Sequence, residues 1–99
     1  MNLLDMQALD ILQEECAEVI QAASKIKRWG PDSTNGGRNP HSNRDLLAME
    51  IGDLLAMIDI VQARFGISSH ELDLHRMKKK EKLKIYSQLF DDEKPSPNK

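Results

Sequence analysis

The chain has 99 residues, of which 39% are hydrophobic and 30% are charged, and its formal net charge is −2 at pH 7. This balance provides no overall positive field, so the sequence predicts neither a nucleic-acid partner nor an anionic membrane surface. The single cysteine, Cys16, excludes an internal disulfide, and no signal-peptide pattern opens the sequence, which predicts a cytoplasmic protein. A chain this short buries a modest part of its surface alone. We therefore expect a homo-oligomer, either a dimer or a tetramer.

The first predicted element is a helix that ends before Gly30 and Pro31, which together form a stop signal. Its apolar residues recur at three- and four-residue steps and form a stripe that we expect to face the core: Leu9, Leu12, Cys16, Val19, Ala23 and Ile26. On this stripe Cys16 is interpreted as a small buried hydrophobic residue.

A loop is predicted next, because residues 30–43, GPDSTNGGRNPHSN, consist mainly of turn-forming residues. Loops of this length without structure of their own are more often functional or mobile than inert. A second helix is predicted from about Asn43 or Arg44 to Phe65, where Gly66 ends it.

The third predicted helix opens with a capping-box pattern formed by Ser68 and Glu71, and it is expected to run to about Leu89. No stretch alternates as a strand would, so the periodicity predicts an all-α fold. Residues 1–90 are expected to form one domain. Residues 91–99, DDEKPSPNK, are charged and contain proline, and we expect a flexible tail there.

The two predicted helices that flank the loop each carry a pair of carboxylates on one face. Glu15 and Glu18 lie three residues apart in the first helix, and Glu50 and Asp53 lie three residues apart in the second. The second pair stands in a segment, residues 46–61, that is apolar around its circumference, so we expect this helix to be buried on most sides. Ionised carboxylates removed from water need a cation, and oxygen ligands without His or Cys favour Mg²⁺ or Mn²⁺. The sequence therefore predicts a metal site formed by these four residues.

The same residues carry a resemblance to a known superfamily. EECAE at residues 14–18, followed by EIGD at residues 50–53, resembles the E-E-x-x-E and E-x-x-D signature of the MazG-like, all-α nucleoside triphosphate pyrophosphohydrolases. This superfamily also includes dimeric dUTPases and phosphoribosyl-ATP pyrophosphohydrolase. The resemblance covers residues 8–86. Thirty-one residues separate Glu18 from Glu50, a little more than in the superfamily, and the extra length falls in the predicted loop.

This resemblance implies an antiparallel helical bundle completed by oligomerisation and a house-cleaning enzyme of the nucleotide pool. The reaction it implies is cleavage between the α- and β-phosphates of a nucleoside triphosphate, giving a monophosphate and pyrophosphate. Mg²⁺ held by Glu15, Glu18, Glu50 and Asp53 would neutralise phosphate oxygens and activate a water. Glu14 lies about 100° round the helix from Glu15, and it is assigned a supporting catalytic role, such as orienting a water.

Candidate substrate-binding residues continue the face of Glu15 and Glu18 along the first helix. Lys25 and Trp29 place a cation and then an aromatic ring beyond the predicted metal site, which is the order of phosphate and base in a nucleotide. Stacking of a base on an aromatic side chain contributes about 1 to 3 kcal/mol. The alternative for Trp29 is a core or dimer-interface residue, and Arg28 is open to either interpretation.

The third helix carries the basic run MKKKEKLK. In the superfamily a lysine pair in this helix contacts the triphosphate, and Lys79 and Lys82, which precede Leu83, resemble that pair. Lys79 also interrupts an otherwise apolar stripe. The alternatives are a solvated basic face, or an ion pair with a carboxylate of the same or a neighbouring subunit.

Two other classes of protein also use helices rich in carboxylates. A di-iron helical bundle requires Glu-x-x-His motifs, and the sequence contains none. A non-catalytic interaction or regulatory module would keep the fold without turnover. Within the superfamily, dUTP and phosphoribosyl-ATP remain alternative substrates.

Overall fold

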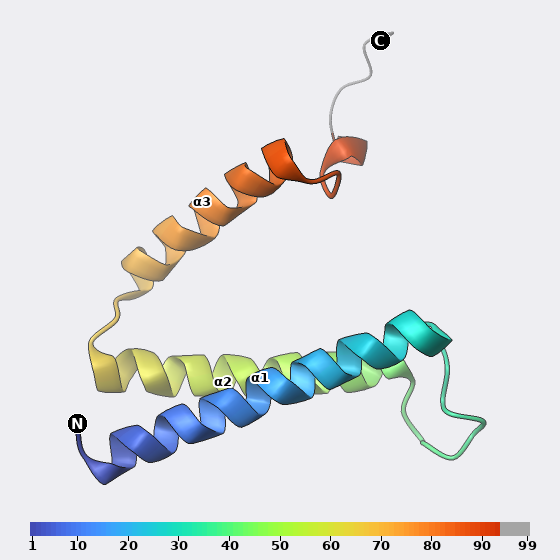
Figure 1. The fold of residues 1–99 in the computed structure, drawn as a ribbon, viewed down its shortest axis with the longest axis horizontal. Coiled ribbons are helices and arrows are strands. Elements are labelled where there is room, and N and C mark those ends of the chain that lie inside the picture. The colour runs from blue at the N-terminus through green and yellow to red at the C-terminus, as the bar shows by residue number, and fades with distance from the viewer. Residues whose placement is uncertain (94–99) are drawn as a thin grey trace, which may run out of the picture. The chain divides into compact units, whose positions relative to one another are not determined.

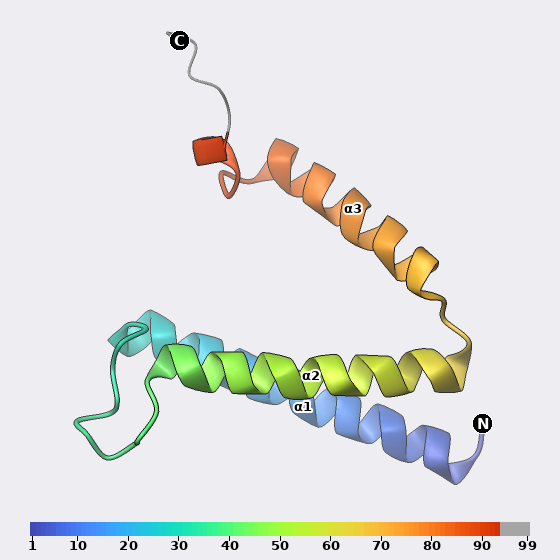
Figure 2. The same cartoon turned by 180° about the vertical axis from the view of Figure 1, so that it is seen from behind.

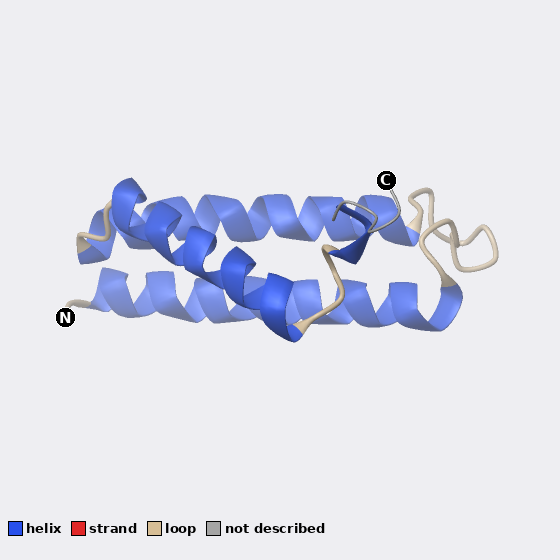
Figure 3. Cartoon of the chain, turned by 90° about the horizontal axis from the view of Figure 1, so that it is seen from above, coloured by secondary structure: helices blue, strands red, loops and turns tan. Residues whose placement is uncertain are grey.

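The structure, a computed structural model, describes residues 1–93 and contains three α-helices there. These are α1 (Leu3–Trp29), α2 (Asn43–Phe65) and α3 (Ser69–Tyr86), followed by a 3₁₀ turn at Asp91–Glu93. Figure 3 shows helices and loops but no strand in this part of the chain, which confirms the all-α prediction. None of the helices among residues 1–93 has the length and the apolar character needed to cross a membrane.

The chain divides into two compact units, Met1–Gly66 and Ile67–Lys99. The first unit contains α1 and α2, and the second contains α3. Of the tail predicted at residues 91–99, residues 91–93 form the 3₁₀ turn, and the remainder lies outside the described residues.

Helix α1 has a reciprocal cap at its start. Asn2 Oδ1 accepts a hydrogen bond from the backbone N–H of Asp5 at 2.8 Å, and Asp5 accepts one from the backbone N–H of Asn2 at 3.4 Å. These bonds satisfy two of the amide groups that a helix start leaves without partners. At the other end Gly30 adopts φ +84°, a conformation that favours glycine, and its N–H donates to Ile26 O at 2.8 Å. The predicted stop at Gly30 is confirmed.

Helices α1 and α2 form an antiparallel hairpin, joined by the loop at residues 30–42 (Figures 1 and 2). At the loop end, the side-chain Nδ2 of Asn43 donates to Gly30 O at 3.1 Å and to Lys25 O at 3.5 Å. At the opposite end, Arg64 donates to a carboxylate oxygen of Asp5 at 2.9 Å. Polar links therefore fix the register of the two helices at both ends.

The second helix has the predicted boundaries, because both of its caps form. Ser42 Oγ accepts from the backbone N–H of Asp45 at 3.1 Å, and Gly66 ends the helix in the left-handed conformation at φ +67°. The prediction that this helix is buried on most sides is wrong for the described chain. Ile51, Leu55 and Ile60 are 40%, 49% and 45% exposed, because α1 alone packs along it within the first unit.

The seam between α1 and α2 follows a seven-residue spacing on both helices. On α1 the buried residues Ala8 and Ala22 lie seven residues before and after Glu15, and on α2 the buried residues Asn43 and Met57 flank Glu50 in the same way. A spacing of seven returns a residue to nearly the same side of a helix. Glu15 and Glu50, both half-buried, therefore lie midway between the buried residues of their own helices.

The side of α1 that faces α2 is not the side that carries the predicted core stripe. Leu9, Leu12, Val19 and Ile26 are half-buried, but Cys16 and Ala23 are exposed. The prediction that Cys16 is buried is therefore wrong for this chain. The physical reason is that α2 covers the side of α1 that carries Glu15, one residue before Cys16, and leaves the adjacent side open to solvent.

Helix α3 begins as predicted, since Ser68 Oγ accepts from the backbone N–H of Glu71 at 3.0 Å. It ends at Tyr86 instead of near Leu89, because Ser87 caps it: both the N–H and the hydroxyl of Ser87 donate to Leu83 O, at 3.0 and 2.6 Å. A serine that bonds back to the preceding turn competes with continuation of the helix.

Candidate metal centre

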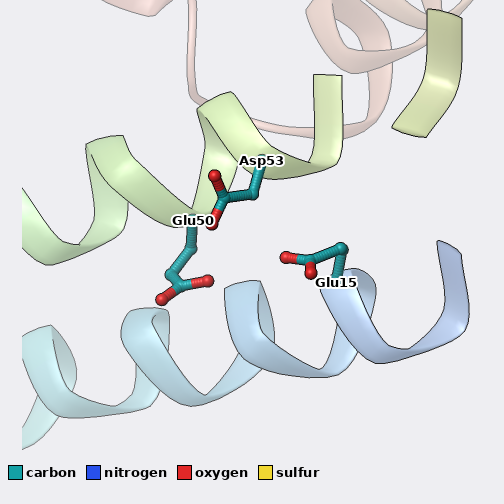
Figure 4. Close-up of side chains that lie close together, drawn as sticks. All are labelled: Glu15, Glu50 and Asp53. Atoms are coloured by element: carbon teal, nitrogen blue, oxygen red, sulfur yellow. The ribbon is translucent and has the colours of Figure 1, made fainter. Parts of the chain in front are cut away.

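Three carboxylates from two helices meet at the middle of the α1–α2 seam. Glu15 of α1 and Glu50 and Asp53 of α2 each offer one oxygen, and these oxygens all lie within 4.8 Å of one another. Figure 4 shows the three side chains directed toward the space between the helices. Glu15 and Glu50 are half-buried, and Asp53 is exposed. We call these three residues the carboxylate cluster.

The carboxylate cluster is under electrostatic strain. The pKa of Glu15 is raised above its ordinary value, first because the side chain is partly withdrawn from water and then because of the negative charges of Asp53, Glu50, Glu18 and Glu14. None of the ion pairs found among residues 1–93 includes a member of the carboxylate cluster. The mutual repulsion of these carboxylates would be relieved by a cation bound between them.

The donor set fits a small divalent metal ion. All three members of the cluster are hard oxygen donors, which suit Mg²⁺ or Mn²⁺ better than Zn²⁺. None of the three histidines, His41, His70 and His75, belongs to the cluster. Mg²⁺ usually keeps several waters and is held by one or two protein carboxylates, so the three carboxylates of the cluster would suffice to hold such an ion.

Two predicted glutamates lie outside the carboxylate cluster. Glu18, predicted as the fourth metal ligand, is exposed on α1 and is not among the residues whose oxygens lie within 4.8 Å of one another. It lines a small cavity together with Glu50. Glu14 is exposed, and its charge contributes to the raised pKa of Glu15. A metal or catalytic role for Glu18 and Glu14 stays a prediction.

Two adjoining cavities lead from the carboxylate cluster to the loop end of the hairpin. The first, about 50 Å³, is lined by Glu18, Lys25 and Glu50, among others. The second, about 150 Å³, is lined by Lys25, Trp29 and loop residues. The two cavities share part of their lining, because Lys25, Asn43 and Leu46 border both. The predicted order of carboxylates, cation and aromatic ring is therefore present along this surface.

Arg28 lies on a different part of this surface. Its guanidinium carbon is 5.7 Å from the centre of the Trp29 ring, a distance at which a cation is attracted to an aromatic face. Arg28 also borders a shallow hollow with Ile20 and Trp29, and it lines neither of the two cavities described above. The structure thus brings Lys25 and Trp29 together with the cavities and leaves Arg28 beside them.

The two candidate lysines of the third helix belong to the second unit. Lys79 and Lys82 are exposed on α3, where Leu72 and Leu83 are half-buried. No ion pair of the described residues includes either lysine. Contact of these lysines with a triphosphate stays a prediction.

Sequence reasoning missed the polar residues that the loop and the start of α2 add to the second cavity. Ser33, Asn35 and Asn39 line it from the loop, and the buried Asn43 lines both cavities. The signal was the Asn-rich composition of residues 33–43, which we interpreted only as turn chemistry. Comparison of the chain with family models, with curated proteins and with solved structures finds no match.

Proposed function

We propose that this protein is a Mg²⁺-dependent nucleoside triphosphate pyrophosphohydrolase of the MazG-like type. The observation that carries the proposal is the convergence of Glu15, Glu50 and Asp53, from two helices, to within 4.8 Å. The sequence places these residues thirty-five and thirty-eight positions apart from Glu15, so their meeting is a property of the fold and not of local spacing. Mn²⁺ is an alternative ion on the same chemical grounds.

The carboxylate cluster would hold the metal, with Glu18 as an additional ligand or as a partner of a bound water. Mg²⁺ at such a site neutralises phosphate oxygens and lowers the pKa of a coordinated water. Lys25, which borders both cavities, supplies a positive charge for the phosphates between the cluster and Trp29. Trp29 offers a flat surface for the base. Lys79 and Lys82 are proposed to contact the triphosphate from α3, and Glu14 to orient a water.

Oligomerisation belongs to the same proposal. The hairpin leaves large apolar side chains exposed on α2, including Ile51, Leu55 and Ile60. Removing such side chains from water is favourable by about 25 cal/mol per Å² of apolar surface, and a second copy of the hairpin provides a matching surface. We therefore propose a homodimer or homotetramer whose helices complete the bundle, acting in the cytoplasm on surplus or noncanonical nucleotides.

The proposed reaction is tested by measuring whether pyrophosphate is released from nucleotides in a Mg²⁺-dependent manner. Nucleoside triphosphates, with dUTP and phosphoribosyl-ATP included, are incubated with and without Mg²⁺, and the products are separated by chromatography. Monophosphate and pyrophosphate are expected. Asp53→Asn, which keeps the shape of the side chain but removes a charged ligand, should lower the rate by orders of magnitude and leave the helical circular dichroism unchanged.

Asp59→Asn is the matched control, because it makes the same change at an exposed position on the opposite side of α2. Its rate should equal that of the unmodified protein. Release of diphosphate and orthophosphate would place the attack at the γ-phosphorus and contradict the assignment. Absence of turnover with the whole panel would favour the alternative of a non-catalytic interaction module.

A further inference from the structure

The loop at residues 30–42 contains an asparagine that is followed by two glycines, Asn35, Gly36 and Gly37. The N–H of Arg38 donates to Asn35 O at 3.3 Å and closes a tight turn. All three residues have positive φ, at +57°, +69° and +81° in chain order. Glycine adopts this conformation without steric cost, and asparagine tolerates it. The three residues are also exposed, so water reaches the turn.

Two groups in this turn, the side-chain amide of Asn35 and the backbone N–H of Gly36, are placed to react with each other. Within residues 1–93 no hydrogen bond uses either of them, whereas the backbone N–H of Asn35 donates to Ser33 Oγ at 3.3 Å. Apart from its chain neighbours, no heavy atom lies within 4 Å of the position that a Cβ would take at Gly36. Since glycine has no side chain to shield its nitrogen, the Gly36 nitrogen is unobstructed as a nucleophile.

The other asparagines of residues 1–93 lack this combination. Asn39 is followed by Pro40, whose nitrogen carries no hydrogen. Asn43 is buried, its Nδ2 donates to backbone carbonyl oxygens, and the N–H of the residue after it also has a backbone partner. Asn2 caps the first helix through its side-chain oxygen and is followed by leucine. Among these asparagines Asn35 therefore has the most accessible amide and the least hindered nitrogen after it.

We propose that Asn35 is a site of spontaneous deamidation, at which the folded protein converts this asparagine into isoaspartate and aspartate. The Gly36 nitrogen gives up its proton and bonds to Cγ of Asn35, the bond between Cγ and Nδ2 breaks, and Nδ2 leaves with that proton as ammonia. Water, the one co-reactant, then opens the cyclic succinimide. Attack of water at Cγ gives aspartate, and attack at the backbone carbonyl carbon of Asn35 gives isoaspartate, whose chain continues through Cβ and Cγ.

The conversion changes both the charge and the backbone of the loop. It creates a carboxylate, which makes the formal net charge of −2 more negative, and isoaspartate adds an extra atom to the backbone of the turn. Asn35 lines the cavity of about 150 Å³ that Lys25 also lines, so the new negative charge enters that lining. A modified molecule therefore differs from a fresh one at the wall of a cavity. This inference is independent of the proposed function, because the reaction needs neither metal nor nucleotide.

Peptide mapping of the full-length protein after storage at neutral and at mildly alkaline pH tests the site. Trypsin, which cleaves after Lys and Arg, releases residues 29–38, whose single asparagine is Asn35, and residues 39–44, which carry Asn39 and Asn43 as internal controls. The mass of the first peptide should rise by the difference between OH and NH₂, and faster at the higher pH, because the amide nitrogen attacks after it loses its proton. The second peptide should keep its mass. Stepwise N-terminal degradation of the isoaspartate form should stop at position 35, where the chain no longer continues through the α-carboxyl group.

The same protein unfolded in guanidinium chloride gives the reference rate. Because the turn is exposed and its reacting groups are unpaired, the rate in the folded protein should lie within about tenfold of the reference, which corresponds to about 1.4 kcal/mol in the barrier. A site that reacts only after the hairpin opens would be slower by orders of magnitude. Asn35→Gly, which suits the positive φ, is the control and should abolish the mass increase in residues 29–38.

Three results would overturn the assignment of Asn35. These are a folded-state rate more than about tenfold below the reference, loss of amide from residues 39–44 as fast as from residues 29–38, and a mass increase that persists in Asn35→Gly. The first two are measured on the unmodified protein, so the site is testable whether or not the variant folds.

Discussion

Replacing Glu50 with Gln should change the thermal stability of the protein in opposite directions without and with Mg²⁺. In the metal-free protein Glu50 contributes one of three negative charges whose oxygens lie within 4.8 Å of one another. Two unit charges 4.8 Å apart repel by about 0.9 kcal/mol in water. Asp53 is exposed, so water and salt screen part of this repulsion. Glu50→Gln should therefore stabilise the metal-free protein by at most about 1 kcal/mol, which corresponds to a rise of a few degrees in melting temperature.

With Mg²⁺ present the order should reverse. A ligand at a hundredfold excess over its Kd stabilises the folded state by about 2.7 kcal/mol, which corresponds to roughly 10–20 °C for a domain of this size. If loss of one charged ligand weakens binding a hundredfold, the same Mg²⁺ concentration stabilises the variant by only about 0.4 kcal/mol. The unmodified protein should thus melt below Glu50→Gln without Mg²⁺ and above it when Mg²⁺ is present.

Differential scanning calorimetry at one protein concentration measures both effects, because melting of an oligomer depends on concentration. Asp59→Asn is the control, since it removes one negative charge from the exposed, opposite side of α2. It should shift neither the metal-free melting temperature nor the Mg²⁺ response by a comparable amount. A Mg²⁺ shift of equal size in the unmodified protein and in Glu50→Gln would refute the shared metal site, and a lower metal-free melting temperature for Glu50→Gln would refute the repulsion.

The other predictions concern pH, the hairpin end and the third helix. Folding raises the pKa of Glu15, so the metal-free protein should gain stability as the pH falls through that raised value. Folding lowers the pKa of Asp5, chiefly through its hydrogen bond from Arg64, so stability should be lost as the pH falls through that lowered value. Urea denaturation from neutral to acid pH should show this rise and fall, and Glu15→Gln should abolish only the rise. Asn43→Ala should lower the free energy of unfolding by about 1–3 kcal/mol, because it removes the side-chain donor to Gly30 O at a buried position, and an unchanged urea midpoint would contradict this. Lys79→Met should raise KM for the nucleotide and leave the melting temperature unchanged if Lys79 contacts phosphate, whereas a destabilised enzyme with a normal KM would assign the lysine to an ion pair.

The ends of the helices were predictable because they depend on local chemistry. The side chains of Ser42 and Ser68 accept from backbone N–H groups three residues ahead, and Gly30 and Gly66 adopt positive φ, so each boundary is decided within a few residues of sequence. The end of α3 was placed too far along for the same kind of reason. The bond from Ser87 to Leu83 O is local, but serine also occurs within helices, and its identity alone does not show that it will terminate one.

The carboxylates of the candidate site were predictable as two pairs, but their exact grouping was not. Periodicity places Glu15 with Glu18, and Glu50 with Asp53, on one side of each helix. Which of them meet depends on the angle at which the helices pack, and that angle is set by residues on both helices at once. The buried alanines Ala8 and Ala22 bring the Glu15 side of α1 against α2, and Glu18 stays outside the cluster.

The sequence by itself determined three helices, all of their ends except the end of α3, and a concentration of carboxylates on two of them, because these features follow from hydrogen bonds and spacing within one segment. Only the tertiary structure decided that Cys16 is exposed, that α2 is covered along one side, and that the buried Asn43 donates a hydrogen bond to Gly30 O at the end of α1. Whether a side chain is buried depends on which segments, distant in the sequence, pack against it and exclude water. A single sequence shows how apolar a helix is, but it does not show how much of that helix its own chain can cover.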